Sequence, residues 1–429
     1  MSTPMNKSMS TPAHITHAEF VPGFSSFYFD DQQAIKAGAR QDGFVYAGAP
    51  VTPGFIAVRQ AGECISVLLT LSDGSVGIGD CAAVQYSGAG GRDPLFVAAD
   101  FVPFLRRHVA PLLEGRDAAD FIGNARFIDE VQVEGRRLHT AIRYGLSQAL
   151  LDAAAHARHR LPVEVMCEDY GLPVETTPIP LFGQSGDDRY NAVDKMVLKR
   201  VDVLPHGLIN HVADKLGHQG EKLRDYVRWL VQRVSALGGD GYRPELHIDV
   251  YGTIGLAFGQ DADRIAGYLA SLEVEAGPLA LSIEGPVDAG SRDGQIEALG
   301  AITQRLRALG SRVRIVADEW CNTLEDVVAF TEAKCCDMVQ IKTPDLGSIH
   351  NVVESVLHCR RHGMQAYQGG TCNETDVSAR ACVQVALAAR PMRLLVKPGM
   401  GFDEGFCTVH NEMQRTLALL RRRHLGARG

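Results

Sequence analysis

The sequence predicts an α/β fold in which a (β/α)8 barrel of the TIM type follows an N-terminal α+β capping domain. Three observations support this prediction. The chain has 429 residues, which is too long for one ordinary domain. Strand-like patterns come first and are followed by separate helix-like ones, as in an α+β module. From about residue 178, short apolar runs alternate with longer amphipathic stretches, as in a barrel of strand–helix units.

The capping domain is expected to span residues 13–170. Its strand-like runs alternate apolar and polar residues, and Asp73 and Gly74 mark a turn between two of them. Its helix-like runs have apolar residues at three- and four-residue spacing. Residues 1–12 are polar and are expected to form a disordered start. The expected strands cover residues 55–59, 64–70 and 75–79, and the expected helices cover residues 95–113, 118–131 and 140–159.

The barrel is expected to span residues 171–429. Eight apolar runs separated by Gly, Pro and Asp occur over about 240 residues, which is the size of a single TIM barrel. The domain boundary should lie near Tyr170 to Pro178, a stretch rich in Pro, Gly and Thr. The expected strands are Pro180–Phe182, Met196–Leu198 leading to Val203–His206, Leu246–Val250, Leu279–Glu284, Val313–Asp318, Met338–Lys342, Met364–Tyr367 and Leu394–Val396.

Composition argues against several classes of protein. The formal charge of −8 is moderate, and no window has the Lys/Arg density of a nucleic-acid-binding surface. No apolar run approaches the roughly 18 residues that span a bilayer, so a cytoplasmic location is expected. The ten cysteines include no CxxC pair and are expected to be mostly small buried hydrophobes in a reducing compartment.

Three consecutive expected strands end in a carboxylate, namely Asp249, Glu284 and Asp318. Their spacings of 35 and 34 residues match the length of one strand–helix unit. Each acid would then lie at the carboxyl-terminal rim of its strand, where barrel enzymes keep their active sites. Converging carboxylates repel each other unless a cation lies among them, and an all-oxygen ligand set suits Mg2+. The alternative for any single acid is a helix N-cap after its strand.

The next expected strand carries Gln340 and Lys342, which are two residues apart and therefore face the same side. We expect this side to be the inner one. The charged form of a lysine beside a divalent cation is disfavoured, which provides the neutral amine that a base needs. The expected target is a proton next to a carboxylate, with the metal stabilising the enolate-like intermediate. Without the acids, Lys342 would instead be read as a surface residue at a strand end.

His206 lies at the second expected strand, across the barrel from Lys342 if the strand order holds. It is a candidate second acid or base on the opposite face of the substrate, although a histidine after Pro in a loop is often structural. His211 and His218 have no third ligand and are expected at the surface.

Two Gly-containing segments follow expected strands at the places where barrel enzymes bind their substrates. Gly183–Gly186 follows the first strand and Gly369–Asn373 follows the seventh. Their backbone N–H groups, amides and hydroxyls suit a carboxylate, although both segments also fit ordinary turns. In the capping domain, Gly88–Gly91 lacks the context of a dinucleotide-binding loop and is interpreted as a mobile lid.

These residues together resemble the enolase superfamily, and within it the methylaspartate ammonia-lyase family. The resemblance covers nearly the whole chain beyond the polar start. It implies reversible loss of ammonia from (2S,3S)-3-methylaspartate to give mesaconate, with Mg2+, activation by K+, and a homodimer. The motifs that carry it are Phe182–Tyr190, Leu204–Gly207, His247–Gly252, Ile283–Pro286, Ala317–Trp320, Gln340–Gly347 and Gln368–Thr375.

The resemblance also assigns roles to single residues. It makes Lys342 the base that removes the C3 proton, with an aci-carboxylate then expelling ammonia from C2, and His206 the base on the other face. The matching metal ligands are Asp249, Glu284 and Asp318. The positions that match residues holding the substrate carboxylates and amino group, or lining the pocket, are Gln184, Gln340, Thr371, Cys372, Gln85, Tyr367 and Leu395.

Two alternatives remain open at this stage. A dehydratase or racemase of the same superfamily would act on another small carboxylate. Racemases usually carry a Lys-x-Lys on the second strand, whereas this chain has Val197-Leu-Lys-Arg-Val201 with His206 beyond it. A non-catalytic barrel would be expected to lack a metal carboxylate or the lysine, and every one of them is present.

Overall fold

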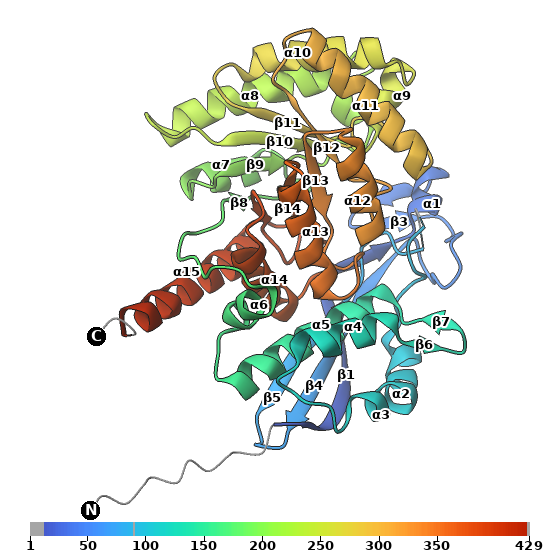
Figure 1. The fold of residues 1–429 in the computed structure, drawn as a ribbon. Helices are drawn as coiled ribbons and strands as arrows, with labels where there is room; N and C mark the ends of the chain where they lie inside the picture. The colour runs from blue at the N-terminus through green and yellow to red at the C-terminus, as the bar shows by residue number, and fades with distance from the viewer. Residues whose placement is uncertain (1–12, 89–90, 427–429) are drawn as a thin grey trace, which may run out of the picture.

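A computed structural model of the chain describes residues 13–88 and 91–426, and it contains a closed barrel next to a capping domain (Figure 1). The expected disordered start at residues 1–12 and part of the expected lid, residues 89–90, lie outside the described residues. The barrel has the order β10-β11-β12-β13-β14-β15-β8-β9, and all its neighbouring strands are parallel. The predicted fold class is therefore confirmed.

The barrel strands are short, and their positions follow the apolar runs closely. The largest difference is at Met196–Leu198, which ends the helix α7 and is not part of the second strand. The strand ends differ by one or two residues, so that Asp318 and Lys342 directly follow β12 and β13. The strands are β8 Leu181–Phe182, β9 Val203–His206, β10 Glu245–Asp249, β11 Leu281–Glu284, β12 Arg314–Ala317, β13 Met338–Ile341, β14 Gln365–Gln368 and β15 Leu394–Leu395.

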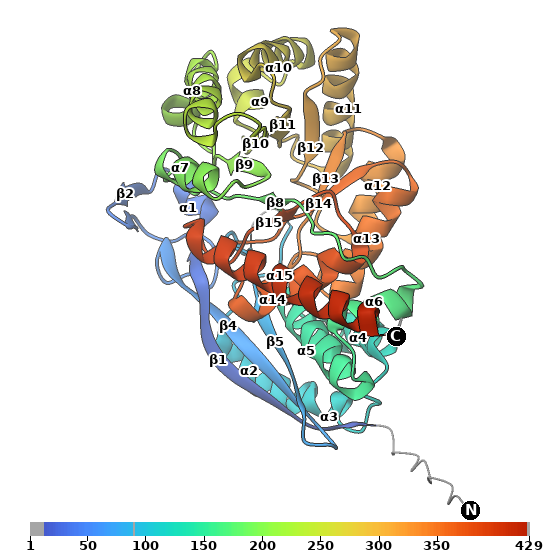
Figure 2. The ribbon, with the colours of Figure 1, turned by 90° about the vertical axis from the view of Figure 1, so that its left-hand side faces the viewer.

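Helices cover the outside of the barrel (Figures 1 and 2). Several begin at a side chain that accepts a backbone N–H, as at Ser291, Thr323 and Thr375, which fixes where the loop ends and the helix starts. The helices are α7 Asn191–Leu198, the π-helix Val212–Leu216, α8 Glu221–Gly238, α9 Thr253–Phe258, α10 Ala262–Ala276, α11 Arg292–Ala308, α12 Leu324–Ala333, α13 Ile349–Arg361, α14 Asp376–Ala389 and α15 Asp403–Gly426.

The capping domain contains an antiparallel sheet of order β1-β4-β5, with helices packed against it (Figure 2). The helix α6 ends at Tyr170, before the first barrel strand begins at Leu181. The elements are β1 Ile15–Asp30, α1 Gln32–Lys36, β2 Arg40–Asp42, β3 Val45–Ala47, β4 Arg59–Leu71, β5 Val76–Ala82, α2 Ala98–His108, α3 Ala110–Leu113, α4 Phe121–Glu130, β6 Gln132–Val133, β7 Arg136–Arg137, α5 Thr140–Arg158 and α6 Pro162–Tyr170.

The structure of this domain differs from the expectations in three places. The expected strand at residues 55–59 is mostly irregular, and only Arg59 begins β4. The longest strand, β1, was not predicted, because its exposed and buried residues do not alternate regularly and it includes Pro22 and Gly23. The expected helix at residues 95–113 is divided into α2 and α3, and Pro111 lies in the first turn of α3.

The helix α5 packs unusually close to β5 because glycines face each other across the contact. A Cβ atom at Gly79 would lie 2.2 Å from the carbonyl oxygen of Gly145, and a Cβ atom at Gly145 would lie 2.5 Å from the backbone nitrogen of Cys81. Such distances are impossible for ordinary side chains, so larger residues at either glycine would push the helix away from the sheet.

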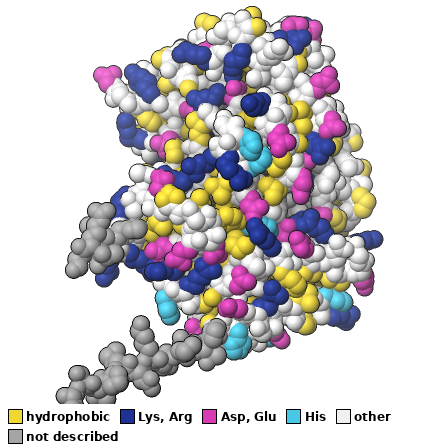
Figure 3. Space-filling model, viewed as in Figure 1, with side chains coloured by type: hydrophobic (Ala, Val, Ile, Leu, Met, Phe, Trp, Pro, Cys, Tyr) yellow, Lys and Arg dark blue, Asp and Glu magenta, His cyan; other side chains and the backbone are white. Residues whose placement is uncertain are grey.

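The charges at the surface and the burial of the cysteines agree with what the composition predicts. On the face shown in Figure 3, positive and negative side chains are interspersed. Nine cysteines are buried and Cys407 is exposed, which confirms the expectation that most are buried. Within residues 13–88 and 91–426, no helix is both long and apolar enough to cross a membrane.

Candidate active site

A cavity lies at the carboxyl-terminal mouth of the barrel and receives nearly all the residues predicted from the sequence. Glu284 and Tyr367 do not line it but hydrogen-bond to Gln340, which does. The predicted residues that line it are Gln85, Gln184, His206, Asp249, Asp318, Gln340, Lys342, Thr371, Cys372 and Leu395. The arrangement follows from topology, because parallel strands bring the residues at their carboxyl ends to one mouth.

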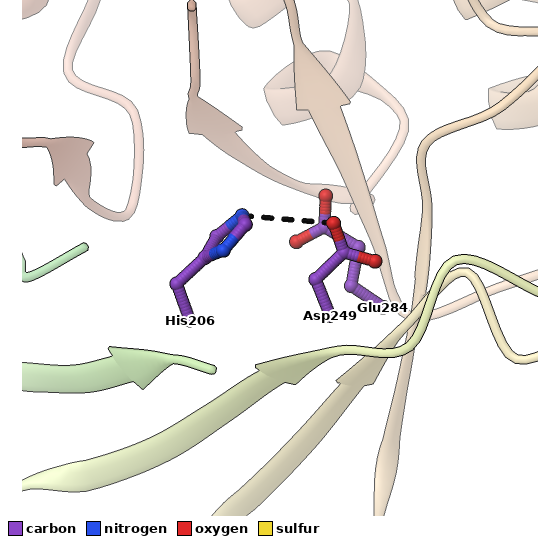
Figure 4. Close-up of side chains that lie close together, drawn as sticks. All are labelled: His206, Asp249 and Glu284. Atoms are coloured by element: carbon purple, nitrogen blue, oxygen red, sulfur yellow. Dashed lines mark ion pairs between the residues drawn. The ribbon is translucent and has the colours of Figure 1, made fainter. Parts of the chain in front are cut away.

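Asp249 and Glu284 are the last residues of the adjacent strands β10 and β11 and pair in register. Their carboxylates and the ring of His206 each offer a ligand atom within 4.8 Å of the others (Figure 4). Burial, and then the charge of Asp318, raise the pKa of Asp249 well above its ordinary value. Burial and the charges of Asp249 and Asp318 do the same for the pKa of Glu284. Burial and the neighbouring carboxylates therefore disfavour the charged forms of Asp249 and Glu284, and a positive charge beside them would favour those forms again.

Asp318 is the third predicted ligand, and its carboxylate forms a buried ion pair with the ammonium of Lys342. It does not belong to the compact group of His206, Asp249 and Glu284. Burial disfavours the ammonium of Lys342, but the charges of Asp318 and Glu319 outweigh burial and raise the pKa of Lys342 above its ordinary value. In the chain as described, two carboxylates thus favour the charged form of Lys342. The expected neutral amine refers to Lys342 beside a divalent cation and stays a prediction.

His206 is the last residue of β9, which lies four strands from β13 in the closed eight-stranded barrel. It therefore faces Lys342 from the opposite side of the mouth. Burial, and then the charge of Lys342, lower the pKa of His206 to about 4, so its ring is neutral near pH 7. His206 also has a φ of 66°, a conformation that costs a non-glycine residue on the order of 1–3 kcal/mol and is concentrated at functional sites.

Gln340 on β13 and Tyr367 on β14 reach Glu284 across the interior of the barrel, from two and three strands beyond β11. The Gln340 amide donates to Glu284 Oε1 at 2.8 Å, and the Tyr367 hydroxyl lies 2.8 Å from both carboxylate oxygens. The side-chain amide oxygen of Gln340, Oε1, is buried and has no hydrogen-bond partner among the described residues. It is therefore a free acceptor at the cavity wall, where it can receive an N–H from a substrate amino group.

The two loops predicted to bind substrate both reach the cavity. Gln184 is held by a hydrogen bond of 2.9 Å from its amide to the carbonyl of Gly399. Thr371 and Cys372 line the other side, and the Cys372 thiol donates to Gln85 of the capping domain at 3.5 Å. Leu395 provides an apolar wall. The expected surface position of His211 and His218 also holds, because both are exposed.

Several cavity residues were not predicted from the sequence. Arg92 forms ion pairs with Asp345 at 2.9 Å and with Glu319 at 3.6 Å, so it ties the capping domain to two barrel loops. Glu319 directly follows a predicted ligand, which was an available signal. Arg92 had no comparable signal, because only the fold brings it near the barrel. The other unpredicted lining residues are Val84, Tyr86, Leu208, Tyr251 and Met400, whereas Gly186 and Gly370 belong to the two segments predicted to bind substrate.

A fully buried ion pair between Lys397 and Glu374 supports the loops from below. Lys397 Nζ lies 3.2 Å from Glu374 Oε1, and it donates to the Thr343 hydroxyl at 3.0 Å and to the carbonyl of Gly369. Tyr144, from α5 of the capping domain, donates to the other oxygen of Glu374 at 2.8 Å. The ion pair thus links Thr343, which follows Lys342, to the two ends of the 369–374 loop and to Tyr144 of the capping domain.

The residues present fit a divalent cation. Asp249, Glu284 and Asp318 offer only carboxylate oxygens, the ligands that Mg2+ prefers, and their mutual repulsion favours a cation between them. The group that includes His206 would also suit a transition metal such as Mn2+.

The capped barrel, with acids at the ends of three successive strands and a lysine on the next, defines an enzyme of the enolase-superfamily type. Solved structures with this fold include the muconate lactonizing enzyme of Pseudomonas fluorescens, with a TM-score of 0.58, 17% identity, and coverage of 88% of this chain and 85% of that chain. At that identity the likeness shows the fold alone.

Closer relatives identify the family. Models of the N-terminus and C-terminus of methylaspartate ammonia-lyase match residues 13–171 and 173–422. The chain is 67% identical to methylaspartate ammonia-lyase of Citrobacter amalonaticus over 407 residues, covering 95% of this chain and 98% of the relative. The crystal structure of the Citrobacter enzyme containing (2S,3S)-3-methylaspartic acid has a TM-score of 0.94 and 66% identity, covering 95% of this chain and 100% of that chain.

The methylaspartase of Clostridium tetanomorphum, solved as a Mg complex, has a TM-score of 0.92 and 52% identity, covering 96% of this chain and 100% of that chain. The chain belongs to the methylaspartate ammonia-lyase family and is a carbon–nitrogen lyase.

Proposed function

We propose that this chain catalyses the reversible elimination of ammonia from (2S,3S)-3-methylaspartate to give mesaconate, with Mg2+ held by Asp249, Glu284 and Asp318. The observation that carries the proposal is the convergence at one mouth of these carboxylates with Lys342 and His206 on opposite sides. The 66% identical Citrobacter structure that contains the same amino acid supports the choice of substrate.

The residues divide the chemistry between them. Lys342 accepts the proton from C3, and the electron pair of the C3–H bond moves onto the neighbouring carboxylate to give an aci-carboxylate. That electron pair then forms the C2=C3 double bond as the C2–N bond breaks and ammonia leaves. When bound, Mg2+ would stabilise the negative charge that develops on the substrate carboxylate next to C3. The side-chain oxygen of Gln340 accepts a hydrogen bond from the amino group of the substrate. Gln184, Thr371 and Cys372 hold the two carboxylates and the amino group of the substrate. Gln85 and Leu395 line the pocket, and Tyr367 acts on it through its hydrogen bond with Gln340.

Asp318 has two roles in this proposal. It holds the ammonium of Lys342 in the chain as described, and it is also a ligand of the proposed Mg2+ site. Base function requires Lys342 as the neutral amine, so its pairing with Asp318 must be weakened when the site is loaded. His206 faces the other side of C3 and is proposed as the base for the opposite C3 configuration.

The proposal extends to activation by K+ and a homodimer, which follow from the family resemblance, and to the cytoplasmic location that the composition predicts. Omitting K+ while keeping Mg2+ should lower the turnover, and sedimentation velocity should give twice the chain mass of 46.5 kDa. Full activity without K+, or a monomer at assay concentration, would remove that part of the proposal.

To test the activity, 3-methylaspartate, Mg2+ and K+ are added to the protein. The formation of a conjugated dicarboxylate is then monitored by its absorbance at about 240 nm. The same assay with the corresponding hydroxy acid tests a dehydratase, and optical rotation without a change in absorbance tests a racemase. Release of ammonia in proportion to absorbance is expected. Turnover of only the hydroxy acid, or racemisation without elimination, would overturn the proposed reaction.

A further inference from the structure

The strand β10 sends three acidic or basic side chains into the barrel, one above the other. Glu245, His247 and Asp249 are alternate residues of the strand, so all three face the same side. Asp249 lies at the mouth, and Glu245 lies at the opposite end of the barrel. His247 lies between them and is fully buried. The proposed metal site is thus connected to the barrel floor by a column of polar groups.

His247 is hydrogen-bonded through both ring nitrogens. Its Nε2 lies 2.8 Å from Oε2 of Glu284, and its Nδ1 lies 3.1 Å from Nη1 of Arg393. A guanidinium can only donate, so Nδ1 must be the acceptor and Nε2 must carry the hydrogen. His247 therefore donates to Glu284, one of the proposed Mg2+ ligands.

Arg393 is itself held in place from the far side. Its Nη2 donates to Oε1 of Glu245 at 2.7 Å, and the side chain is 1% exposed. Arg314 donates to the other carboxylate oxygen of Glu245 at 2.8 Å, and in the described part of the chain no hydrogen bond joins it to His247. The two arginines share one carboxylate, and only Arg393 continues the column toward the mouth.

The ring of His247 is also oriented by packing. It stacks on Phe182 with a centroid distance of 4.4 Å and an angle of 15°, and it meets Tyr367 edge to face at 5.2 Å. These contacts fix the ring plane, and the hydrogen bond from Arg393 fixes which nitrogen bears the hydrogen. Glu284 then receives donors from His247, Gln340 and Tyr367, which leaves it little freedom to rotate.

We infer that Arg393 is a positioning residue for the metal site, because it fixes the tautomer of His247 so that His247 Nε2–H donates to Glu284. The inference rests on the proposed function, since it assumes that Glu284 binds Mg2+. Groups that hold a metal ligand through a hydrogen bond typically change metal affinity by about 10–100-fold when they are removed. The column down the barrel is therefore part of the metal site.

The variants Arg393→Met and His247→Phe test the inference. Arg393→Met removes the donor to Nδ1, while His247→Phe keeps a ring for the stack on Phe182 and removes the hydrogen bond to Glu284. Arg314→Met is the matched control, because it removes the other arginine of Glu245. Calorimetric titration of each full-length protein with Mg2+ alone should show affinity weakened about 10-fold or more in the two test variants. The control should stay within about 2-fold of the unaltered chain, well below that range.

A second measurement uses the unaltered chain, so it decides the inference even where a variant does not fold. Two-bond 15N–1H correlation spectra of the protein labelled at histidine should show His247 with a hydrogen on Nε2 and none on Nδ1. The opposite tautomer, or test variants that bind Mg2+ as tightly as the control, would overturn the inference. Failure of the unaltered chain to bind Mg2+ would instead overturn the proposed metal site.

Discussion

The ammonium of Lys342 and the carboxylate of Asp318 form a buried ion pair between the ends of the adjacent strands β13 and β12. The pairing places the proposed base directly beside a proposed metal ligand. It also explains the raised pKa of Lys342, because Asp318 and Glu319 outweigh the effect of burial. Base and metal site are thus electrostatically coupled, and substitutions at either should affect the reaction in different ways.

Replacing Lys342 with Ala should lower the turnover of 3-methylaspartate by about 10^3-fold or more, because only the proton acceptor is removed. Mg2+ binding and the circular dichroism spectrum should be retained. The control is Lys334→Ala, which removes an exposed lysine that does not line the cavity. Turnover close to normal in Lys342→Ala would exclude it as the base.

Changing any one of Asp249, Glu284 or Asp318 to Asn or Gln should weaken Mg2+ binding, because a neutral amide is a poorer ligand for a hard cation. A loss of at least about 10-fold in affinity is expected by calorimetry, since changes outside the ligands already cost that much. Asp293→Asn serves as the control, because its side chain is 87% exposed and lies on the outer helix α11. Unchanged affinity in all three variants would remove the metal-site assignment.

Replacing Lys397 with Met should destabilise the fold, because Glu374 would keep its charge without its buried partner. Breaking such a pair costs about 3–5 kcal/mol. Urea unfolding measures the loss, and the double variant with Glu374→Gln should recover part of it because no unpaired charge remains. Equal losses in the single and double variants would show that the charge of Glu374 is not the cause.

The sequence predicts the barrel and its mouth well for a physical reason. Strands that are buried on both sides appear in the sequence as continuous apolar runs, and the loop after each strand reaches the same mouth. The residues at strand ends can therefore be assigned to the mouth from the sequence alone. Asp249, Glu284 and Lys342 were found in this way. β1 was not found, because a half-exposed strand with Pro22 and Gly23 has no regular alternation.

Other residues depend on contacts between distant parts of the chain. Arg92 reaches Asp345 across 253 residues, and Tyr144 reaches Glu374 across 230 residues, so no local pattern indicates either contact. Arg393 precedes its strand and would be read as an exposed end residue, yet it is 1% exposed inside the barrel. Such residues are recognised only once the strand order is known.

The last prediction concerns His206, which faces Lys342 from four strands away in the closed barrel. Two bases on opposite sides of one carbon can each remove only the proton on their own side, so each should serve one C3 configuration. His206→Ala should therefore damage mainly the slower reaction of the (2S,3R) diastereomer and should reduce the rate with the (2S,3S) substrate less than Lys342→Ala does. Both variants are assayed on the separated diastereomers, with C3 deuterium exchange followed by NMR and with His218→Ala, an exposed histidine, as the control. Equal proportional losses on both diastereomers in the two variants would make the two-base arrangement wrong and would leave His206 as a residue that orients the substrate or belongs to the metal site, where its ring already lies beside Asp249 and Glu284.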